Sequence, residues 1–141
     1  MAGHGKVRTE LSKRNKYYIS KHRRMELVHF CLQYPEWVRL RDEYECSSIV
    51  RRALERLPDN SYDSDPTGES AVKLADVRKK MNMVLAASLE ADDQIGSYIF
   101  KAVTEGLSFA NLKAKNEIPC EKDMFYDRYH KFFWILSKMR D

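Results

Sequence analysis

The sequence predicts a compact, single all-α domain of five to seven helices that ends in a helix-turn-helix. The chain has 141 residues, of which 43% are hydrophobic and 33% charged, and this is enough to build one substantial core. It has only five glycines and four prolines, and residues that favour helices are abundant. The expected segments are a flexible basic arm (1–16), N-terminal helices (17–57), a loop (58–69), central helices (70–105) and the helix-turn-helix (106–139).

The N-terminal helices follow from caps and apolar spacing. Ser20 is a suitable N-cap for the first helix. Pro35 either kinks this helix or lies in the first turn of the next one, where proline is best tolerated. Ser47 or Ser48 is expected to cap a short third segment. Apolar residues recur at helical spacing in the first part of this region, at Leu27, Phe30, Cys31, Tyr34, Trp37 and Val38.

The second half begins with a change of composition. The stretch "PDNSYDSDPTGE" (58–69) is rich in turn-forming residues and predicts a loop, and a long helix should follow over about 70–90. Asp92 or Asp93 could cap the next helix, and Gly106 is a natural C-cap for it. Ser108 is expected to cap a short helix before the last one.

The net charge of +4 is unevenly distributed. Residues 1–35 carry 8 Lys/Arg and 2 Asp/Glu, residues 36–93 carry 9 and 13, and residues 94–141 carry 8 and 6. Two basic ends around an acidic middle are compatible with phosphate contacts at the ends, whereas a mobile, solvated tail explains the first 16 residues equally well.

No catalytic, metal or cofactor motif is recognisable, so we expect a protein that is not an enzyme. His22 and His29 are seven residues apart, which is too far for a compact zinc site. The "DSDPTGE" loop resembles the start of a calcium loop but has Leu74 where the bidentate Glu should be. The three cysteines show no paired spacing, no apolar run is long enough for a membrane span and no signal peptide is evident, which together favour a cytoplasmic protein.

The C-terminal region has the pattern of a helix-turn-helix, in which a short helix braces a longer one. In the last helix, a stripe spaced by four, three and four residues should face the core: Phe125, Tyr129, Phe132 and Leu136. Lys122, Tyr126 and His130 are expected to lie open on the other face, which would enter the major groove. Lys113, Lys115 and Lys122 would then flank this helix as phosphate contacts.

Negative charge on the same face leaves other interpretations open. Glu121, Asp123 and Asp127 would oppose DNA, although acids at the start of a helix also suit its dipole. DNA binding, a purely structural helical hairpin and a protein-docking surface therefore all remain alternatives.

Three segments carry a resemblance to a known family: "NKYYISKHRRMELVHFCLQYPEW", "SDPTGESAVKLADVRKKMNMV" and "KAVTEGLSFANLKAKNEIPCEKDMFYDRYHKFFWILSKMR". They resemble small phage and prophage proteins of Gram-positive bacteria that are similar to the ArpU/RinA-type late transcriptional regulators. The C-terminal part of those regulators resembles the helix-turn-helix of sigma-factor region 4.

The resemblance implies a DNA-binding accessory transcriptional regulator in the cytoplasm of a bacterial host. Its bracing helix would begin at Ser108, and its DNA-binding residues would be Lys113, Lys115, Lys122, Tyr126, Arg128, His130 and Lys131. A basic arm would lie near the same double-stranded DNA and would supply Lys13, Arg14, Lys16, Lys21, Arg23 and Arg24. Dimers are common for this motif, so a homodimer is one option. The alternative is a small helical protein that binds and inhibits a host protein, such as RNA polymerase or a defence nuclease.

Overall fold

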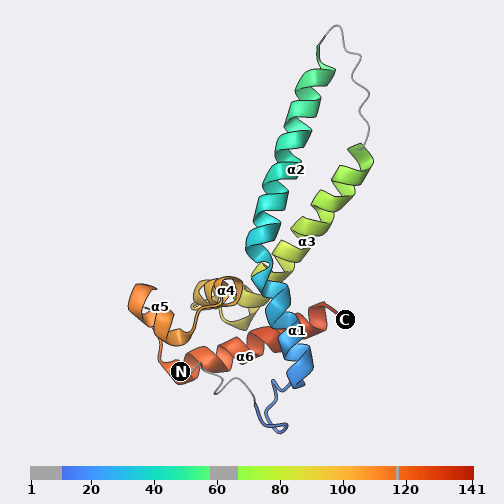
Figure 1. Cartoon of the computed structure of the whole chain (residues 1–141). Coiled ribbons are helices and arrows are strands. Elements are labelled where there is room, and N and C mark those ends of the chain that lie inside the picture. The colour runs from blue at the N-terminus through green and yellow to red at the C-terminus, as the bar shows by residue number, and fades with distance from the viewer. Residues whose placement is uncertain (1–10, 58–66, 117) are drawn as a thin grey trace. The chain divides into compact units, whose positions relative to one another are not determined.

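The computed structural model describes residues 11–57, 67–116 and 118–141, and these residues form helices and connecting turns without a strand (Figure 1). The all-α class is therefore confirmed, with a helix number inside the expected range. The helices are α1 (Lys21–Leu32), α2 (Tyr34–Glu55), α3 (Thr67–Ala91), α4 (Gly96–Glu105), α5 (Phe109–Asn116) and α6 (Lys122–Met139).

The described helices belong to two compact units, whereas the sequence predicted a single domain. The first unit, called the helical body here, contains residues 11–33 and 83–141, and so includes α1, the end of α3, and α4 to α6. The second, the hairpin unit, contains residues 34–82, which are α2 and the beginning of α3. Most of the predicted 58–69 loop lies outside the described residues, and α3 begins at Thr67, slightly earlier than expected.

The start of α1 agrees with the sequence. The Ser20 hydroxyl accepts a hydrogen bond from the Arg23 backbone N–H at 3.3 Å, as an N-cap should. Gln33 ends α1, and Pro35 is the second residue of α2. Proline is tolerated there because the first backbone N–H groups of a helix have no partner within it.

The short third segment expected after Ser47 or Ser48 is not a separate helix. Both serines lie inside α2, which continues without interruption to Glu55. Serine is a weak signal for a helix start when no proline or glycine is near it, since its intrinsic cost inside a helix is small.

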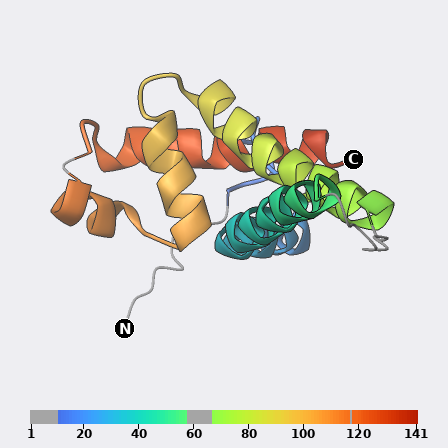
Figure 2. The same cartoon turned by 90° about the horizontal axis from the view of Figure 1, so that it is seen from above.

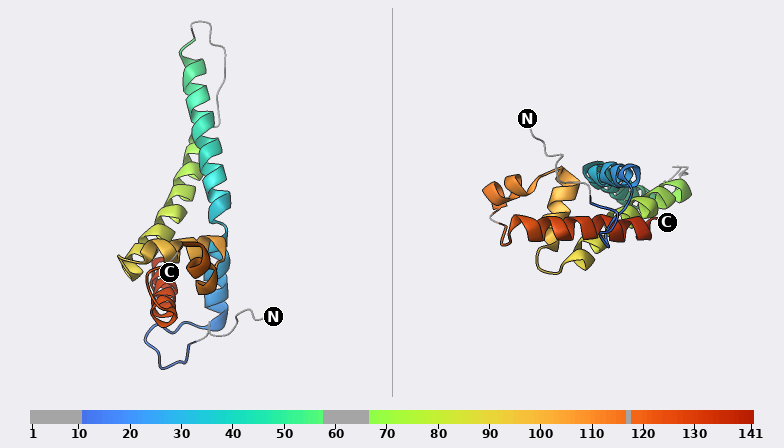
Figure 3. Two further views of the ribbon diagram at one scale, coloured as in Figure 1. Left: turned by 90° about the vertical axis from the view of Figure 1, so that its left-hand side faces the viewer. Right: turned by 90° about the horizontal axis from the view of Figure 1, so that it is seen from below.

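The hairpin unit places α2 and α3 side by side, as the views in Figures 1 and 3 agree. The buried side chains in its described part are Trp37, Val77 and Met81. An ion pair between Glu45 and Arg78 joins the two helices, and the Lys80 ammonium lies 6.0 Å from the centre of the Trp37 ring. These contacts fix which side of α2 faces α3.

The connection between α3 and α4 is organised by Asp92. Its carboxylate accepts hydrogen bonds from the backbone N–H groups of Gln94 at 2.7 Å and Ile95 at 2.9 Å. It also accepts one from the Arg128 guanidinium of α6 at 3.0 Å. Asp92 is therefore not the N-cap of α4 that the sequence suggested, since that position is Ile95 without a side-chain cap, and its carboxylate instead closes the turn before the helix.

α6 is the central helix of the body and packs against α1, α4 and α5. Figure 2 shows α4 crossing it. Gly106 ends α4 in the left-handed conformation, with φ of 70°, as predicted for its C-cap. Around α6 lies a continuous apolar core whose fully buried members include Leu27, Ile99, Leu112, Ile118, Phe125, Phe132 and Leu136.

Candidate nucleic-acid interface

α5 and α6 occupy the positions predicted for the two helices of a helix-turn-helix. Ser108 and Asn111 cap α5 reciprocally: the Asn111 N–H donates to the Ser108 hydroxyl at 3.2 Å, and the Ser108 N–H donates to the Asn111 side-chain oxygen at 3.1 Å. A tilted contact between the Phe109 and Phe125 rings, with ring centres 5.6 Å apart, holds α5 against the start of α6. That this pair forms a helix-turn-helix, and that it reads DNA, both stay predictions.

The predicted apolar stripe of α6 faces the core. Phe125, Phe132 and Leu136 are fully buried, as expected. Tyr129 keeps partial exposure, but burial raises the pKa of its hydroxyl to about 12. Its phenol is therefore neutral over the physiological pH range.

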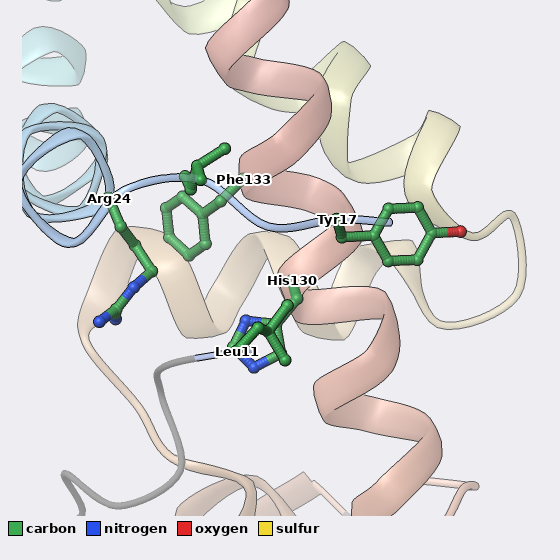
Figure 4. Close-up of a pocket in the computed structure, with 6 residues that line it drawn as sticks. Leu11, Tyr17, Arg24, His130 and Phe133 are labelled. Atoms are coloured by element: carbon green, nitrogen blue, oxygen red, sulfur yellow. The ribbon is translucent and has the colours of Figure 1, made fainter. Parts of the chain in front are cut away.

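His130 is buried, with 6% of its surface exposed, so the prediction that it lies open is wrong. The cause is the chain segment before α1. Three residues of this segment, Leu11, Tyr17 and Ile19, line a cavity of about 10 Å³ at His130 (Figure 4). Arg24 and Phe133 complete its lining. Burial and the nearby Arg24 lower the pKa of His130, and Asp127 opposes them in part. A histidine in this environment cannot reach a DNA groove.

Two other predicted contacts of α6 have structural partners. The Tyr126 hydroxyl, on a half-buried side chain, accepts a hydrogen bond from the Phe109 backbone N–H at 3.2 Å and so anchors the start of α5. Arg128 is also half-buried and forms ion pairs with Asp92 and Asp127. These hydrogen bonds raise the pKa of Arg128, which therefore stays charged but is engaged within the body.

The remaining α6 cations are more accessible, but acids flank them. Lys122 is exposed, as predicted, and Lys131 is half-buried. Glu121 and Asp123 are exposed beside Lys122, and Asp127 is half-buried one turn further on. The start of α6 consequently presents more negative than positive charge to solvent, which disfavours its insertion into a DNA groove.

The described part of the basic arm is folded onto the body by two turns. The Asn15 N–H donates to the Ser12 carbonyl and the Tyr18 N–H to the Asn15 carbonyl, both at 3.0 Å. Tyr17 then packs against Trp134 of α6, with ring centres 5.5 Å apart. The beginning of the arm, residues 1–10, lies outside the described residues.

The six cations predicted for this arm divide into two groups. Arg23 is internal to the body: its guanidinium donates to Ser137 at 3.1 Å and pairs with Asp141 at 3.0 Å. Arg24 is half-buried beside the His130 cavity. The other four are exposed and form no ion pair with another described residue: Lys13, Arg14, Lys16 and Lys21.

The two lysines predicted on the bracing helix are also accessible. Lys113 and Lys115 are exposed near the end of α5, and neither pairs with an acid among the described residues. Ser108 lies just before this helix, as expected.

The docking of the arm on α6 was missed by the sequence analysis. A signal was present, because "YYI" at 17–19 interrupts a basic stretch with three residues suited to packing. Its target was not readable, since the contacts join positions more than 100 residues apart.

No helix among the described residues is long and apolar enough to cross a membrane. Comparison with protein-family models finds no match, and neither does comparison with curated proteins or with solved structures.

Proposed function

We propose that this protein binds double-stranded DNA through phosphate contacts, as an accessory regulator of the kind that the sequence resemblance implies. The observation that carries the proposal is the set of exposed cations held on the folded body, at residues 13–21 and on α5. Cations without an internal acidic partner remain available for phosphates, and a folded backbone reduces the entropy lost on binding.

The two cationic groups lie along the same helix. α5 packs on α6 at Phe125 and Tyr126, and the arm packs on it at Trp134. Eight residues of helix, from Tyr126 to Trp134, correspond to about 12 Å along the axis. DNA carries a phosphate charge about every 1.7 Å of its length, so both groups can contact one duplex.

This proposal gives α6 a supporting role. Its apolar side chains hold α5 and the arm, while the acids near its start and the burial of His130 disfavour deep insertion into a groove. Of the residues expected to bind DNA, the proposal retains Lys113, Lys115 and Lys122 together with the four exposed cations of the arm.

The test is binding of a labelled 30-base-pair duplex followed by fluorescence anisotropy over a salt series. Affinity should fall linearly on a log–log plot, with a slope no steeper than about −6 for the seven cations that the proposal retains. Replacing Lys13, Arg14, Lys16 and Lys21 by Ala should weaken binding and make the slope less steep by about 3 to 4.

A matched single-residue comparison removes the effect of net charge. Lys113→Ala should weaken binding, whereas Lys79→Ala should not, although both lysines are exposed on helices and unpaired among the described residues. Equal effects of the two changes, or no binding of DNA even at low salt, would contradict the proposal. The second outcome would favour the host-protein alternative.

A further inference from the structure

His130 of α6 is a buried histidine without a hydrogen-bond partner among the described residues. Its imidazole also forms no ion pair with any of them, and its ring contact is with Tyr129, with ring centres 5.8 Å apart. The cavity of about 10 Å³ beside it has the size of about one water molecule. The charged residue that shares the lining of this cavity is Arg24 of α1 (Figure 4). A proton on His130 would therefore place two positive charges at one buried site.

The charges around this site oppose that proton. The Arg24 guanidinium forms no ion pair with another described residue, so its charge is not neutralised there. Asp127 lies one turn before His130 on α6 and offsets Arg24 in part, but its carboxylate is already engaged in an ion pair. The phenols of Tyr17 and Tyr129 carry no charge at neutral or acidic pH, and neither α4 nor α5 contributes a described residue to the lining. Burial and Arg24 thus lower the pKa of His130.

The cover over His130 is held more weakly than the helix beneath it. This cover, called the docked segment here, consists of residues 11–19, and none of them is buried, whereas Phe133 of α6 is 1% exposed. The hydrogen bonds that the docked segment forms with described residues all stay within the segment. Its attachment to α6 consists of the cavity lining and the ring contact between Tyr17 and Trp134. Local opening begins where few buried contacts must break, so this segment can detach while α6 stays folded.

We propose that the docked segment is a pH-dependent cover, and that a proton on His130 releases it from α6. With the segment detached, water reaches the imidazole and solvates its charge, which the closed site cannot do. Lys13, Arg14 and Lys16 belong to the docked segment and are exposed, so their positions relative to the body are lost on release.

The linkage has a defined sign and size. A detached His130 takes up its proton near the ordinary pKa of 6.5, and the docked one does so only at lower pH. Docking therefore keeps its full strength above about pH 6.5 and weakens by at most about tenfold for each pH unit below it. Between pH 7.5 and pH 5, the equilibrium should shift toward the detached state by up to about 30-fold.

This cover would also regulate DNA binding, an extension that rests on the proposed function. If the cations of the arm must be held on the body to contact DNA, the apparent dissociation constant increases in inverse proportion to the docked fraction. The sign of this effect is opposite to the one expected from charge alone. Protonated histidines make a protein more cationic, which by itself strengthens its attraction to phosphates.

Limited digestion with trypsin tests the release without DNA. Wild type and His130→Gln are digested in one tube between pH 7.5 and pH 5, and intact mass spectrometry measures cleavage after Lys13, Arg14 and Lys16. The ratio of the two rates cancels the pH dependence of trypsin and should rise by up to about 30-fold, because cleavage follows the population of the open segment. A constant ratio overturns the proposal. An equal rise in cleavage after Lys131 overturns it as well, since the whole body would then be opening.

Two further variants separate the site from general effects of charge and folding. His22→Gln changes an exposed histidine of α1 and should follow wild type at every pH. Trp134→Ala removes the ring contact from the α6 side without altering the cleaved bonds, so it should be cleaved faster than wild type at pH 7.5. No acceleration in Trp134→Ala, or a flat pH profile in His22→Gln, contradicts the proposed site. An unstructured reference peptide with a Lys–Tyr bond replaces His130→Gln as the internal standard if that variant does not fold.

Fluorescence anisotropy with the 30-base-pair duplex then tests the regulation of DNA binding at constant salt. The dissociation constant of wild type, divided by that of His130→Gln, should rise from pH 7.5 to pH 5 by the factor that the docked fraction falls. A constant ratio, in a protein whose cleavage shows release, overturns the regulatory role. Absence of DNA binding by both proteins at pH 7.5 overturns the proposed function instead, and the digestion still decides whether His130 releases the docked segment.

Discussion

Gly96 lies where the first turn of α4 meets the end of α3. A Cβ atom at this position would come within 2.6 Å of the Ser88 carbonyl oxygen and 3.2 Å of the Leu89 Cα. Both are backbone atoms, so neither can move without shifting the helix. This contact cannot be predicted from the sequence, because an isolated glycine before a helix usually indicates only a local turn or cap.

Alanine substitutions should therefore have opposite consequences at the two glycines that begin helices. Gly96→Ala should lower the free energy of unfolding by about 1–3 kcal/mol through overpacking. Gly68→Ala should be neutral or raise it by up to about 1 kcal/mol, since no described atom outside its own helix turn lies within 4 Å of the added Cβ. Urea denaturation measures both changes, and equal effects would contradict the close approach at Gly96.

His130 should make the stability of the body depend on pH. Its pKa in the folded protein lies below the ordinary value of 6.5, so the unfolded chain binds a proton more readily. The stabilisation is complete above about pH 6.5 and is lost as the pH falls through the folded-state pKa.

The measurement is the melting temperature between pH 7.5 and pH 5, compared with that of His130→Gln. Wild type should lose more stability than the variant over this range. Asp92, whose pKa is lowered from 3.8, titrates below this window and is present in both proteins, as are the exposed His22 and His29. Parallel curves for the two proteins would show that His130 is not the responsible group.

At the scale of the helices, the sequence predicted best where apolar spacing and caps agree. The core stripe of α6 and the caps at Ser20, Gly106 and Ser108 are local signals, and the structure confirms them. The division of α2 at Ser47 or Ser48 failed because a serine that can cap a helix also fits inside one.

The polar face of α6 shows what local spacing cannot predict. Helical geometry separates His130 from Phe125, the first residue of the core stripe, by about 140°. Whether that side meets water depends on a segment more than 100 residues earlier, which covers it through Leu11, Tyr17 and Ile19. The exposure of the candidate DNA-binding residues was thus predictable only in part. The accessible lysines follow from local charge, but the long-range partners of Arg128 and His130 do not.

At the scale of the whole molecule, the two units differ in how much core they contain. Among the described residues of the hairpin unit three apolar side chains are buried, Trp37, Val77 and Met81, whereas most of the buried residues belong to the body. Burial of apolar surface supplies most of the free energy that opposes conformational entropy. The sequence did not predict this difference in core size, since the helical pattern is equally strong in both units.

Amide hydrogen exchange should reveal the difference. Amides of α2 should exchange through openings of lower free energy than those of α6. Mass spectrometry of peptides from 38–55 and 125–138 compares the two helices directly. Equal protection in both would mean that the hairpin unit opens only when the body unfolds.

The long-range docking of α6 also determines when the body can assemble during synthesis. α1 packs on α4 and α6, which leave the ribosome only after the whole hairpin unit has been made. At about 5–20 residues per second, the roughly 100 residues from the end of α1 to the end of α6 take about 5–20 s. For that interval the apolar face of α1, with Leu27 and Phe30, has no α6 to cover it. The hairpin unit can fold before the body, whose helices are completed only after it. We therefore expect α1 to be the segment of the nascent chain that chaperones bind.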